Sequence, residues 1–413
     1  MADTGNLSRR NFIAGSAAAG SVAPLLSAKS AARVVGANDR LHVGMIGAGG
    51  NARGHMRALK SLANEDNVEI AAVCDLYDPR RDAAAEFTGG KPYKDYRRLL
   101  EHPGLDYVTV SVPEHWHAPI TLDAADAGLH VYVEKPLTYS IEEGVQVVKK
   151  VKSTGIVLQC GIQGMSDDSY ETAAELIRDG AIGKVVMAHI DYSRNHRDDF
   201  WLKDPDPDVK PGVNLDWKMY LGKAKKRRWE PDRFFSWRRY WDYSGGIATD
   251  LFVHRLARIV KACGLTTPSR VVATGGQYFF TGGAEVPDTF NALLEYPEGI
   301  NVLLVSSLAN QTQIRHLIRG NKGTIEFTRE GFTLEPEGLY KDDVKPLIHK
   351  KSGGEDMALH HHNLHNAIRL GEQLKCDLEL AFNVSMACQM TVESFRMKKS
   401  LGWDRRRERI IKT

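Results

Sequence analysis

The fold is decided by residues 41–52, which read LHVGMIGAGGNA. The apolar run 41–46 predicts a buried strand, and the Gly-x-Gly-x-x-Ala pattern after it predicts a tight turn into a helix starting near Arg53. Gly47 permits the bend, Gly49 lets the backbone approach a pyrophosphate, and a small third residue lets the helix pack on the strand. Backbone amides at the start of that helix would face the anion. The predicted nucleotide-binding residues of this turn are Gly47, Gly49, Gly50, Asn51 and Ala52.

A second apolar strand, residues 68–74 (VEIAAVC), ends at Asp75. An acid at that strand end can accept a hydrogen bond from the 2'-hydroxyl of an adenosine ribose, which favours NAD. Arg80 and Arg81 follow within a few residues and could instead meet a 2'-phosphate. The sequence therefore predicts NAD as cofactor and leaves NADP possible.

Strand and helix patterns alternate along the next part of the chain. Strands are predicted at 107–112 and 131–133, with a helix from Glu114 to Gly128 between them and a helix after Ser140 that has capping-box spacing to Glu143. This order predicts a doubly wound parallel sheet, whose ligands bind beyond the carboxyl ends of the strands. The residues at those ends that we predict to bind cofactor are Pro113, His117, Glu134 and Lys135, with Asp75.

The pattern changes after Gly161. We predict an α+β domain with a large, open, mostly antiparallel sheet and helices on one face. The predicted helices run to Gly180 and near 360–372 and 380–400, and the predicted strands are 185–193, 270–275, 290–295, 301–307 and 324–328. The predicted division of the chain is an export signal at 1–36, an NAD(P)-binding Rossmann domain at 37–160 and a substrate-binding and oligomerisation domain at 161–413.

Composition excludes several classes of protein. The chain has 413 residues, of which 42% are hydrophobic and 26% charged, and this excludes a disordered protein. Its 55 basic and 52 acidic side chains give a net charge of +3, so we expect no nucleic-acid partner, and the basic run 223–228 is interpreted as a solvated loop or a subunit contact. No apolar run reaches the roughly 18 residues of a membrane span.

The first residues look like a targeting segment. Arg9 and Arg10, followed by Phe12 and a stretch of small and apolar residues, predict a twin-arginine export signal and a periplasmic or secreted protein. The five cysteines are scattered and predict no disulfide framework. That suits an export route for proteins that are already folded, and a cofactor could then be loaded before export.

Several of these motifs together resemble the Gfo/Idh/MocA family of NAD(P)-dependent oxidoreductases. They are the glycine turn, the acid after the second strand, residues 113–118 (PEHWHA), Glu134-Lys135-Pro136, and residues 245–254 (GGIATDLFVH), which are similar to the family's GG-x3-D-x3-H segment. The resemblance covers residues 41–413. It implies sugar-type substrates and an open sheet that commonly forms oligomer contacts, so we expect a homodimer or homotetramer.

The candidate catalytic residues are Lys135, Asp250 and His254. Asp250 and His254 are four residues apart, so on a helix they would share a face, and a histidine beside a carboxylate can exchange a proton with a hydroxyl. Lys135 could hydrogen-bond that hydroxyl or join the proton relay. The resemblance implies that all three line the site where a sugar hydroxyl meets the nicotinamide, and it leaves open which one is the base.

Arg238 and Trp241 are candidate substrate-binding residues, because aromatic rings stack on sugars and arginines bind their hydroxyls or carboxylates. The histidines at 360, 361, 362 and 365 raise a metal alternative, since His361 and His365 share a helical face. No acidic or cysteine ligand stands nearby in the sequence, and nicotinamide hydride transfer needs no metal. We therefore predict no metal site.

The sequence predicts an exported NAD(P)-dependent oxidoreductase that acts on a hydroxyl or keto group of a carbohydrate. No pool of free NAD recycles outside the cytoplasm, so the cofactor should be tightly bound. One alternative is a redox-neutral NAD-dependent glycoside hydrolase or lyase like glycoside hydrolase family 109, whose Glu-x-Pro segment lacks the lysine that is present here as Lys135. Another is a non-enzymatic sugar-binding protein. The sugar and the carbon that is oxidised stay open.

Overall fold

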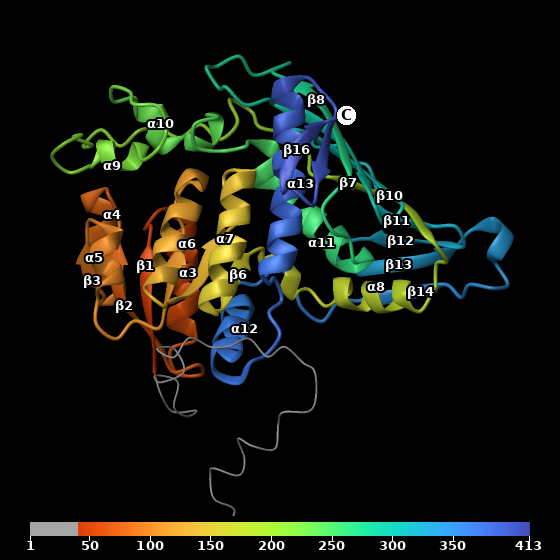
Figure 1. Cartoon of the computed structure of the whole chain (residues 1–413), viewed down its shortest axis with the longest axis horizontal. Helices are drawn as coiled ribbons and strands as arrows, with labels where there is room; N and C mark the ends of the chain where they lie inside the picture. The colour runs from red at the N-terminus through yellow and green to blue at the C-terminus, as the bar shows by residue number, and fades with distance from the viewer. Residues whose placement is uncertain (1–39) are drawn as a thin grey trace, which may run out of the picture.

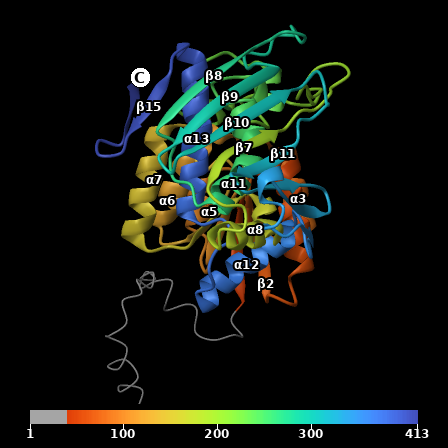
Figure 2. The ribbon, with the colours of Figure 1, turned by 90° about the vertical axis from the view of Figure 1, so that its right-hand side faces the viewer.

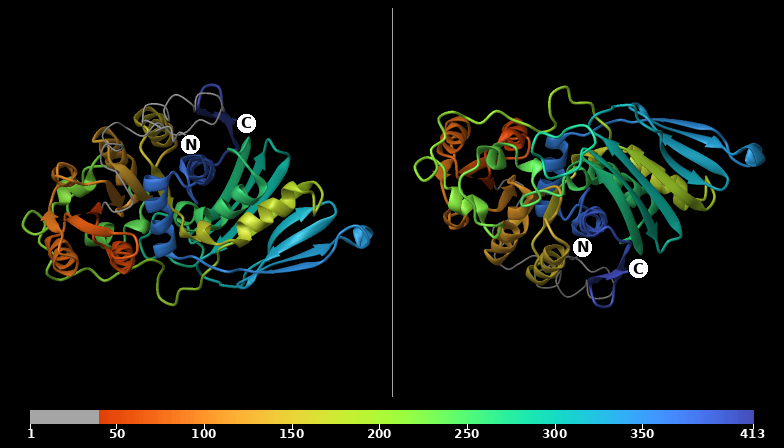
Figure 3. Two further views of the ribbon diagram at one scale, coloured as in Figure 1. Left: turned by 90° about the horizontal axis from the view of Figure 1, so that it is seen from below. Right: turned by 90° about the horizontal axis from the view of Figure 1, so that it is seen from above.

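The computed structural model describes residues 40–413, and the predicted export signal lies outside the described residues. Two β-sheets stand side by side, a parallel one in the N-terminal half and a larger one formed by the rest of the chain (Figures 1 and 3). Helix α13 (Leu378–Met397) runs between them in Figure 1. Within residues 40–413, no helix is both long and apolar enough to cross a bilayer.

The first sheet is entirely parallel, with strand order β3-β2-β1-β4-β5-β6. This confirms the predicted doubly wound sheet, and its order reverses between β1 and β4, next to the glycine turn. The strands are β1 (Leu41–Ile46), β2 (Val68–Cys74), β3 (Lys91–Tyr93), β4 (Tyr107–Val110), β5 (His130–Glu134) and β6 (Leu158–Gly161). The helices are α3 (Gly50–Ser61), α4 (Asp78–Thr88), α5 (Tyr96–Leu100), η1 (Glu114–Trp116), α6 (His117–Asp126) and α7 (Ile141–Thr154).

Local sequence explains the elements of this domain. Strands β4 and β5 are buried along their whole length, as expected of a parallel sheet covered on both faces. Ser140 and Glu143 form the predicted capping box at the start of α7. Helix α3 begins at Gly50, three residues before the predicted start, because the turn itself contributes its first residues. The prediction missed the short strands β3 and β6.

The second sheet has ten strands in the order β14-β13-β12-β11-β7-β10-β9-β8-β15-β16, and only β7 and β10 run parallel. The prediction of a large, open, mostly antiparallel sheet is confirmed. The strands are β7 (Val185–Asp191), β8 (Arg270–Gly276), β9 (Thr289–Tyr296), β10 (Ile300–Ser307), β11 (His316–Gly320), β12 (Gly323–Phe327), β13 (Gly331–Pro336), β14 (Leu347–Lys350), β15 (Leu401–Asp404) and β16 (Arg409–Lys412). The prediction missed β11 and the last four strands at the sheet edges, β13 to β16.

One face of this sheet is covered and the other is open. Burial alternates along β10, so every second side chain is buried. The covering helices are α8 (Ser169–Arg178), α11 (Val253–Cys263) and α13, with η2 (Gln163–Ser166) packed on α11, and Figure 2 shows α11 and α13 behind the sheet. The face turned to the viewer in Figure 2 carries no helix.

A third unit, which we name the cap, comprises residues 203–243. It contains α9 (Trp217–Leu221), α10 (Pro231–Phe235) and the turn η3 (Trp237–Arg239), and its aromatic side chains form a hydrophobic cluster that includes Tyr77 of the first domain. The cap lies over the edge of the parallel sheet in Figure 1. Backbone bonds join the two, since Asp78 N donates to Asn214 O at 2.8 Å and Asp216 N donates to Leu76 O at 3.1 Å.

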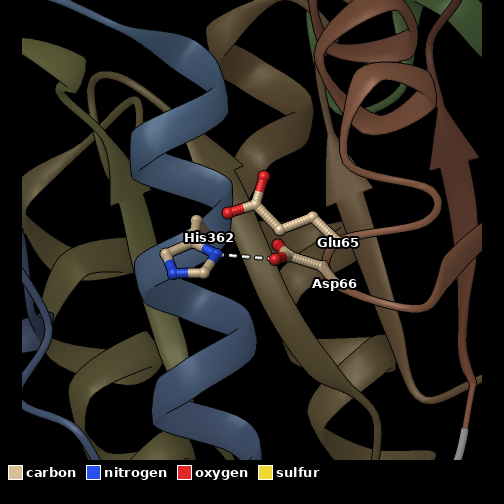
Figure 4. A group of neighbouring side chains, drawn as sticks. All are labelled: Glu65, Asp66 and His362. Carbon is tan, nitrogen blue, oxygen red and sulfur yellow. Dashed lines mark hydrogen bonds and ion pairs between the residues drawn. The ribbon is translucent and has the colours of Figure 1, made fainter.

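Near its end the chain returns to the first domain through α12 (Met357–Leu370), which packs against α3. The four histidines of α12 do not meet at one point, since His360 and His361 have partners of their own and only His362 and His365 share one. His362 and His365 bond the two oxygens of Asp66, and Figure 4 shows His362 with Asp66 and the neighbouring Glu65. Because both Asp66 oxygens already bind histidines, this group is a contact that docks α12.

Candidate active site

The glycine turn has the geometry of an anion cradle. Gly47 has φ of +94°, and a Cβ there would collide with the Ser111 carbonyl oxygen, so only glycine fits. A Cβ at Gly50 would meet nothing within 4 Å. Helix α3 begins with no side-chain cap and no acidic residue in its first turn, so its first amides are left for an anionic ligand. Ala52 is fully buried beneath the turn.

Asp75 lies beside this turn at the end of β2. Its two carboxylate oxygens accept from Ala48 N at 2.8 Å and Tyr77 N at 2.9 Å, which fixes the side chain. Burial raises the pKa of Asp75, although the Arg80 guanidinium and the two backbone bonds oppose that shift. The side chain keeps acceptor lone pairs for a ligand hydroxyl, because each oxygen can accept more than one bond.

Two cavities meet at Lys135. The first cavity, of about 180 Å³, runs along the carboxyl ends of the parallel strands under the cap. Its lining includes Gly47, Gly49, Gly50, Asn51, Asp75, Pro113, Glu134, Lys135, Tyr220, Phe235 and Trp237. The second cavity, of about 600 Å³, lies between the first domain and the large sheet, and its lining includes Glu134, Lys135, Gln163, Arg194, Trp201, Lys203, Trp237, Arg238, Asp250 and His254.

A three-membered ion cluster stands where the cavities join. The Lys135 ammonium donates to Asp250 Oδ1 at 2.7 Å and to the Asp250 carbonyl at 2.9 Å, and Arg238 Nε donates to the same Oδ1 at 2.7 Å. Burial disfavours the charge on Asp250, but the two cations hold its pKa far below the usual range. The cluster therefore carries one net positive charge at neutral pH.

His254 stands apart from this cluster. Residues 248–252 form a π-helical turn before α11 begins at Val253, and this wider turn changes the register that would place Asp250 and His254 on one face. The structure thus gives Asp250 partners other than the predicted histidine. Burial, and next the charge of Lys135, lower the pKa of His254 to about 3, so its imidazole is neutral and carries a lone pair. Its Nδ1 lies 3.6 Å from Glu355 Oε1.

Glu134 borders both cavities, and two buried side chains hold its carboxylate in place. His55 Nε2 and Gln163 Nε2 lie 2.9 and 2.7 Å from Glu134 Oε1. Burial opposes ionisation, but these bonds and the nearby Lys135 lower the pKa of Glu134 to about 2. Gly161 is required beside it, because a Cβ there would collide with the carboxylate.

Two residues of the PEHWHA segment act as braces. Glu114, which the sequence analysis did not single out, is buried and accepts from Ser244 Oγ at 2.6 Å, Thr249 Oγ1 at 2.9 Å and Gly245 N at 3.1 Å. It thereby ties the first domain to the turn before Asp250. His117, predicted to bind cofactor, has its ring nitrogens 2.7 Å from the Pro136 carbonyl and 2.9 Å from the Val112 carbonyl, so neither is free for a ligand.

Of the two predicted substrate-binding residues, only Arg238 lines the cavities. Arg238 lines both cavities and stacks over the Trp237 ring, with 4.3 Å from its guanidinium carbon to the ring centroid. Trp241 lines neither cavity and packs against Phe395, with ring centroids 6.2 Å apart. Trp201 and Trp237 supply the aromatic surface of the second cavity, and their place in an irregular segment gave no sequence signal for this.

These features fit a dinucleotide. Unpaired amides face the first cavity, an acid stands at the end of β2, and an open glycine leaves room for a pyrophosphate. The fold and the strand-end residues define a dinucleotide-binding protein with a second, ligand-holding domain.

Comparisons with known proteins identify its family. Residues 41–162 match the family model described as "Oxidoreductase family, NAD-binding Rossmann fold", and residues 217–402 match "Oxidoreductase family, C-terminal alpha/beta domain". The chain belongs to the Gfo/Idh/MocA oxidoreductase family.

Individual relatives either match only part of this chain or share little sequence with it. A glycosyl hydrolase family 109 protein of Shewanella pealeana is 30% identical over 216 residues, 45% of this chain and 46% of that protein. The NAD(+)-dependent scyllo-inositol 2-dehydrogenase of Bacillus subtilis is 32% identical over 134 residues, 32% of this chain and 39% of that protein. The chain thus matches less than half the length of both relatives. A levoglucosan dehydrogenase solved with NADH and levoglucosan superimposes with a TM-score of 0.68 at 19% identity, over 88% of this chain and 99% of that one.

Proposed function

We propose that the protein is an NAD-dependent oxidoreductase that oxidises a hydroxyl, or reduces a keto group, of a sugar or sugar derivative. The observation that carries the proposal is the Lys135, Asp250 and Arg238 cluster at the junction of the two cavities, with neutral His254 in the second. A bound nicotinamide supplies the hydride acceptor or donor. Similarity to sugar and inositol dehydrogenases supports the substrate class.

The residues of the cluster divide the work. The hydrogen bond to Asp250 fixes the Lys135 ammonium, which can donate a hydrogen bond to the reacting oxygen and stabilise negative charge as it develops there. An ammonium has no lone pair, whereas neutral His254 does. His254 is therefore the residue we assign to take the hydroxyl proton in the oxidation and to return it in the reduction.

We propose NAD as the cofactor. Asp75 is fixed by two backbone amides and can accept from ribose hydroxyls, while its negative charge would repel a 2'-phosphate. Arg80 also lines the first cavity, where its guanidinium lies over the Phe234 ring at 5.0 Å and over the Phe235 ring at 5.4 Å, and it is the group that would meet a 2'-phosphate if NADP were bound instead.

We propose that this cofactor stays bound through turnover. Tyr220, Phe235 and Trp237 of the cap line the first cavity across from the glycine turn, so a dinucleotide there would have protein on two sides. Lys203, also of the cap, lines both cavities and has no acidic partner within residues 40–413, so it can neutralise phosphate charge. A retained cofactor suits the export that Arg9 and Arg10 predict, and we propose a periplasmic or secreted location.

Redox-neutral glycoside cleavage is the second candidate. The match to a glycosyl hydrolase family 109 protein favours it, although that match covers under half of either chain. Lys135 and its ion pair with Asp250 favour the dehydrogenase, because the hydrolase motif lacks the lysine.

We also propose a homo-oligomer formed through the open face of the large sheet. The strand register aligns Val272, Leu293, Leu303 and Leu317 in one row across that face, with His189 between the last two. Val272 and Leu293 are 42% and 41% exposed, which is high for apolar side chains at the centre of a sheet.

The test uses sugars, inositols and glycosides as substrates. With at least one polyol, we expect the absorbance of reduced nicotinamide to appear. In His254→Asn this signal should be absent while the nucleotide stays bound. Cleavage of a chromogenic glycoside with no net absorbance change would instead establish the hydrolase. Mass measurement by light scattering checks the oligomer.

A further inference from the structure

The histidines of α12 have no role in the proposed reaction. One of them, His361, is nevertheless connected to the active site through buried hydrogen bonds. His361 Nε2 lies 2.9 Å from His55 Nδ1, and His55 Nε2 lies 2.9 Å from Glu134 Oε1. His55 and His361 have no exposed surface, and Glu134 is 5% exposed. Three side chains from three distant segments thus form one buried line that ends at the edge of both cavities.

The proton positions along this line follow from the one atom that has no partner. His361 Nδ1 is buried and has no hydrogen-bond partner among residues 40–413, so an N–H there would be desolvated without compensation. The proton of His361 therefore sits on Nε2 and is donated to His55 Nδ1. His55 then carries its own proton on Nε2 and donates it to Glu134. Burial and the neighbouring imidazoles hold the pKa of His361 well below its usual value, which agrees with a neutral ring.

Packing fixes the hydrogen-bonded chain of His361, His55 and Glu134 in this arrangement. The Tyr132 ring stacks on His361 with centroids 4.4 Å apart and meets the edge of His55 at 5.0 Å. Gln163 Nε2 donates to the same Oε1 of Glu134 at 2.7 Å. Both donors therefore bind Oε1, and Oε2 is left to accept from a ligand in the cavities that Glu134 lines.

We propose that His361, acting through His55, is a positioning residue that fixes the Glu134 carboxylate so that its Oε2 binds a hydroxyl of the cofactor at the junction of the two cavities. This inference rests on the proposed function, because it needs a dinucleotide in the first cavity. It assigns to helix α12, from the second domain, a role in cofactor binding, although no residue of α12 other than Met357 borders either cavity.

The test is a double-mutant cycle on NAD affinity, measured by equilibrium dialysis against labelled NAD of full-length protein that has first been freed of its bound nucleotide. His361→Phe keeps a ring over Tyr132 but removes the donor, and we expect NAD affinity to fall about five- to tenfold, the value of one hydrogen bond. Glu134→Gln should weaken NAD at least as much. The double variant should bind no more weakly than Glu134→Gln alone, because His361 would act only through that carboxylate.

His365→Phe is the matched control, since it removes a buried histidine of the same helix whose partners are Asp66 and Tyr107. It should lower the unfolding temperature at least as much as His361→Phe and change NAD affinity less than twofold. Nitrogen-15 NMR of the histidines gives a second measurement, with a proton on Nε2 expected for both His55 and His361.

Equal losses of NAD affinity in the His361 and His365 variants would overturn the proposal, and so would full additivity in the cycle or an Nδ1–H form of His361. A wild-type protein that binds no NAD at all would overturn the proposed function itself.

Discussion

The two cavities that meet at Lys135 are built in different ways. The first, of about 180 Å³, is lined largely by the carboxyl ends of parallel strands and by the turn that follows β1, so its residues lie in short, ordered motifs. The second, of about 600 Å³, draws its walls from residues spread between Gly50 and Met357. The proposed cofactor site therefore follows from local sequence, whereas the proposed substrate site depends on how the domains and the cap come together.

Removing Lys135 should have the largest effect, because it serves both cavities. We expect Lys135→Ala to lower turnover about 10²–10⁴-fold, since the charge that stabilises the reacting oxygen is lost. Bound nucleotide should change much less. Single-turnover kinetics and nucleotide content measure the two effects. Lys149→Ala is the control, as that lysine is 65% exposed and pairs with Glu408. A Lys135→Ala protein that kept its activity would contradict the proposal that Lys135 acts at the junction of the two cavities.

Substitutions in the glycine turn should separate folding from binding. Gly47→Ala forces a Cβ against the Ser111 carbonyl at positive φ, and we expect it to destabilise the protein by about 2–4 kcal/mol. Gly50→Ala places a methyl group in open space and should leave the unfolding temperature unchanged while it weakens nucleotide binding. Thermal unfolding and NAD titration distinguish them. Equal stability losses would contradict the geometry of the turn.

Asp75 should set the choice of dinucleotide. We expect Asp75→Ala to weaken NAD about 10- to 100-fold and to leave NADP binding unchanged or improved, because an acceptor for the ribose and a repulsive charge both disappear. Asp78→Ala is a suitable control, since Asp78 pairs with Arg81 and borders neither cavity. Unchanged discrimination in the Asp75 variant would remove the argument for NAD.

Glu114 should give the smallest effect, a pH dependence of stability. Burial raises the pKa of Glu114 to about 7, above the ordinary value of 4.5. The folded state therefore holds a proton that the unfolded state releases, and the wild type should lose stability as pH rises from about 4.5 to 7. Relative to Glu114→Gln, which does not titrate, the loss should be at most about 3 kcal/mol. Denaturant unfolding at several pH values measures it, and a constant difference would contradict the assignment.

The sequence predicted most of the first domain, all but the short strands β3 and β6, because its signals are local. The apolar run before Gly47, the acid after β2 and the capping box at Ser140 each depend on a few adjacent residues. The edge strands β13 to β16 have weaker patterns, since they are short and half-exposed. Their pairing is set by contacts with distant strands, which periodicity alone does not reveal.

The candidate site was predicted only where motifs carried it. Lys135, Asp250 and Arg238 meet as a cluster, but the pairing of Asp250 with Lys135 in place of His254 depends on a π-helical turn that sequence does not signal. Glu114 and His55 were missed because no repeating sequence pattern marks a single buried polar residue in a loop or a helix. Their partners lie more than 70 residues away along the chain.

We propose that the cap makes NAD a resident group of the first cavity. Mass spectrometry of the nucleotide released by denaturing purified, extensively dialysed protein would measure how much nucleotide each chain retains. We expect about one NAD or NADH for each chain. An empty protein that binds added NAD only weakly would contradict the claim and indicate a dehydrogenase with freely exchanging cofactor.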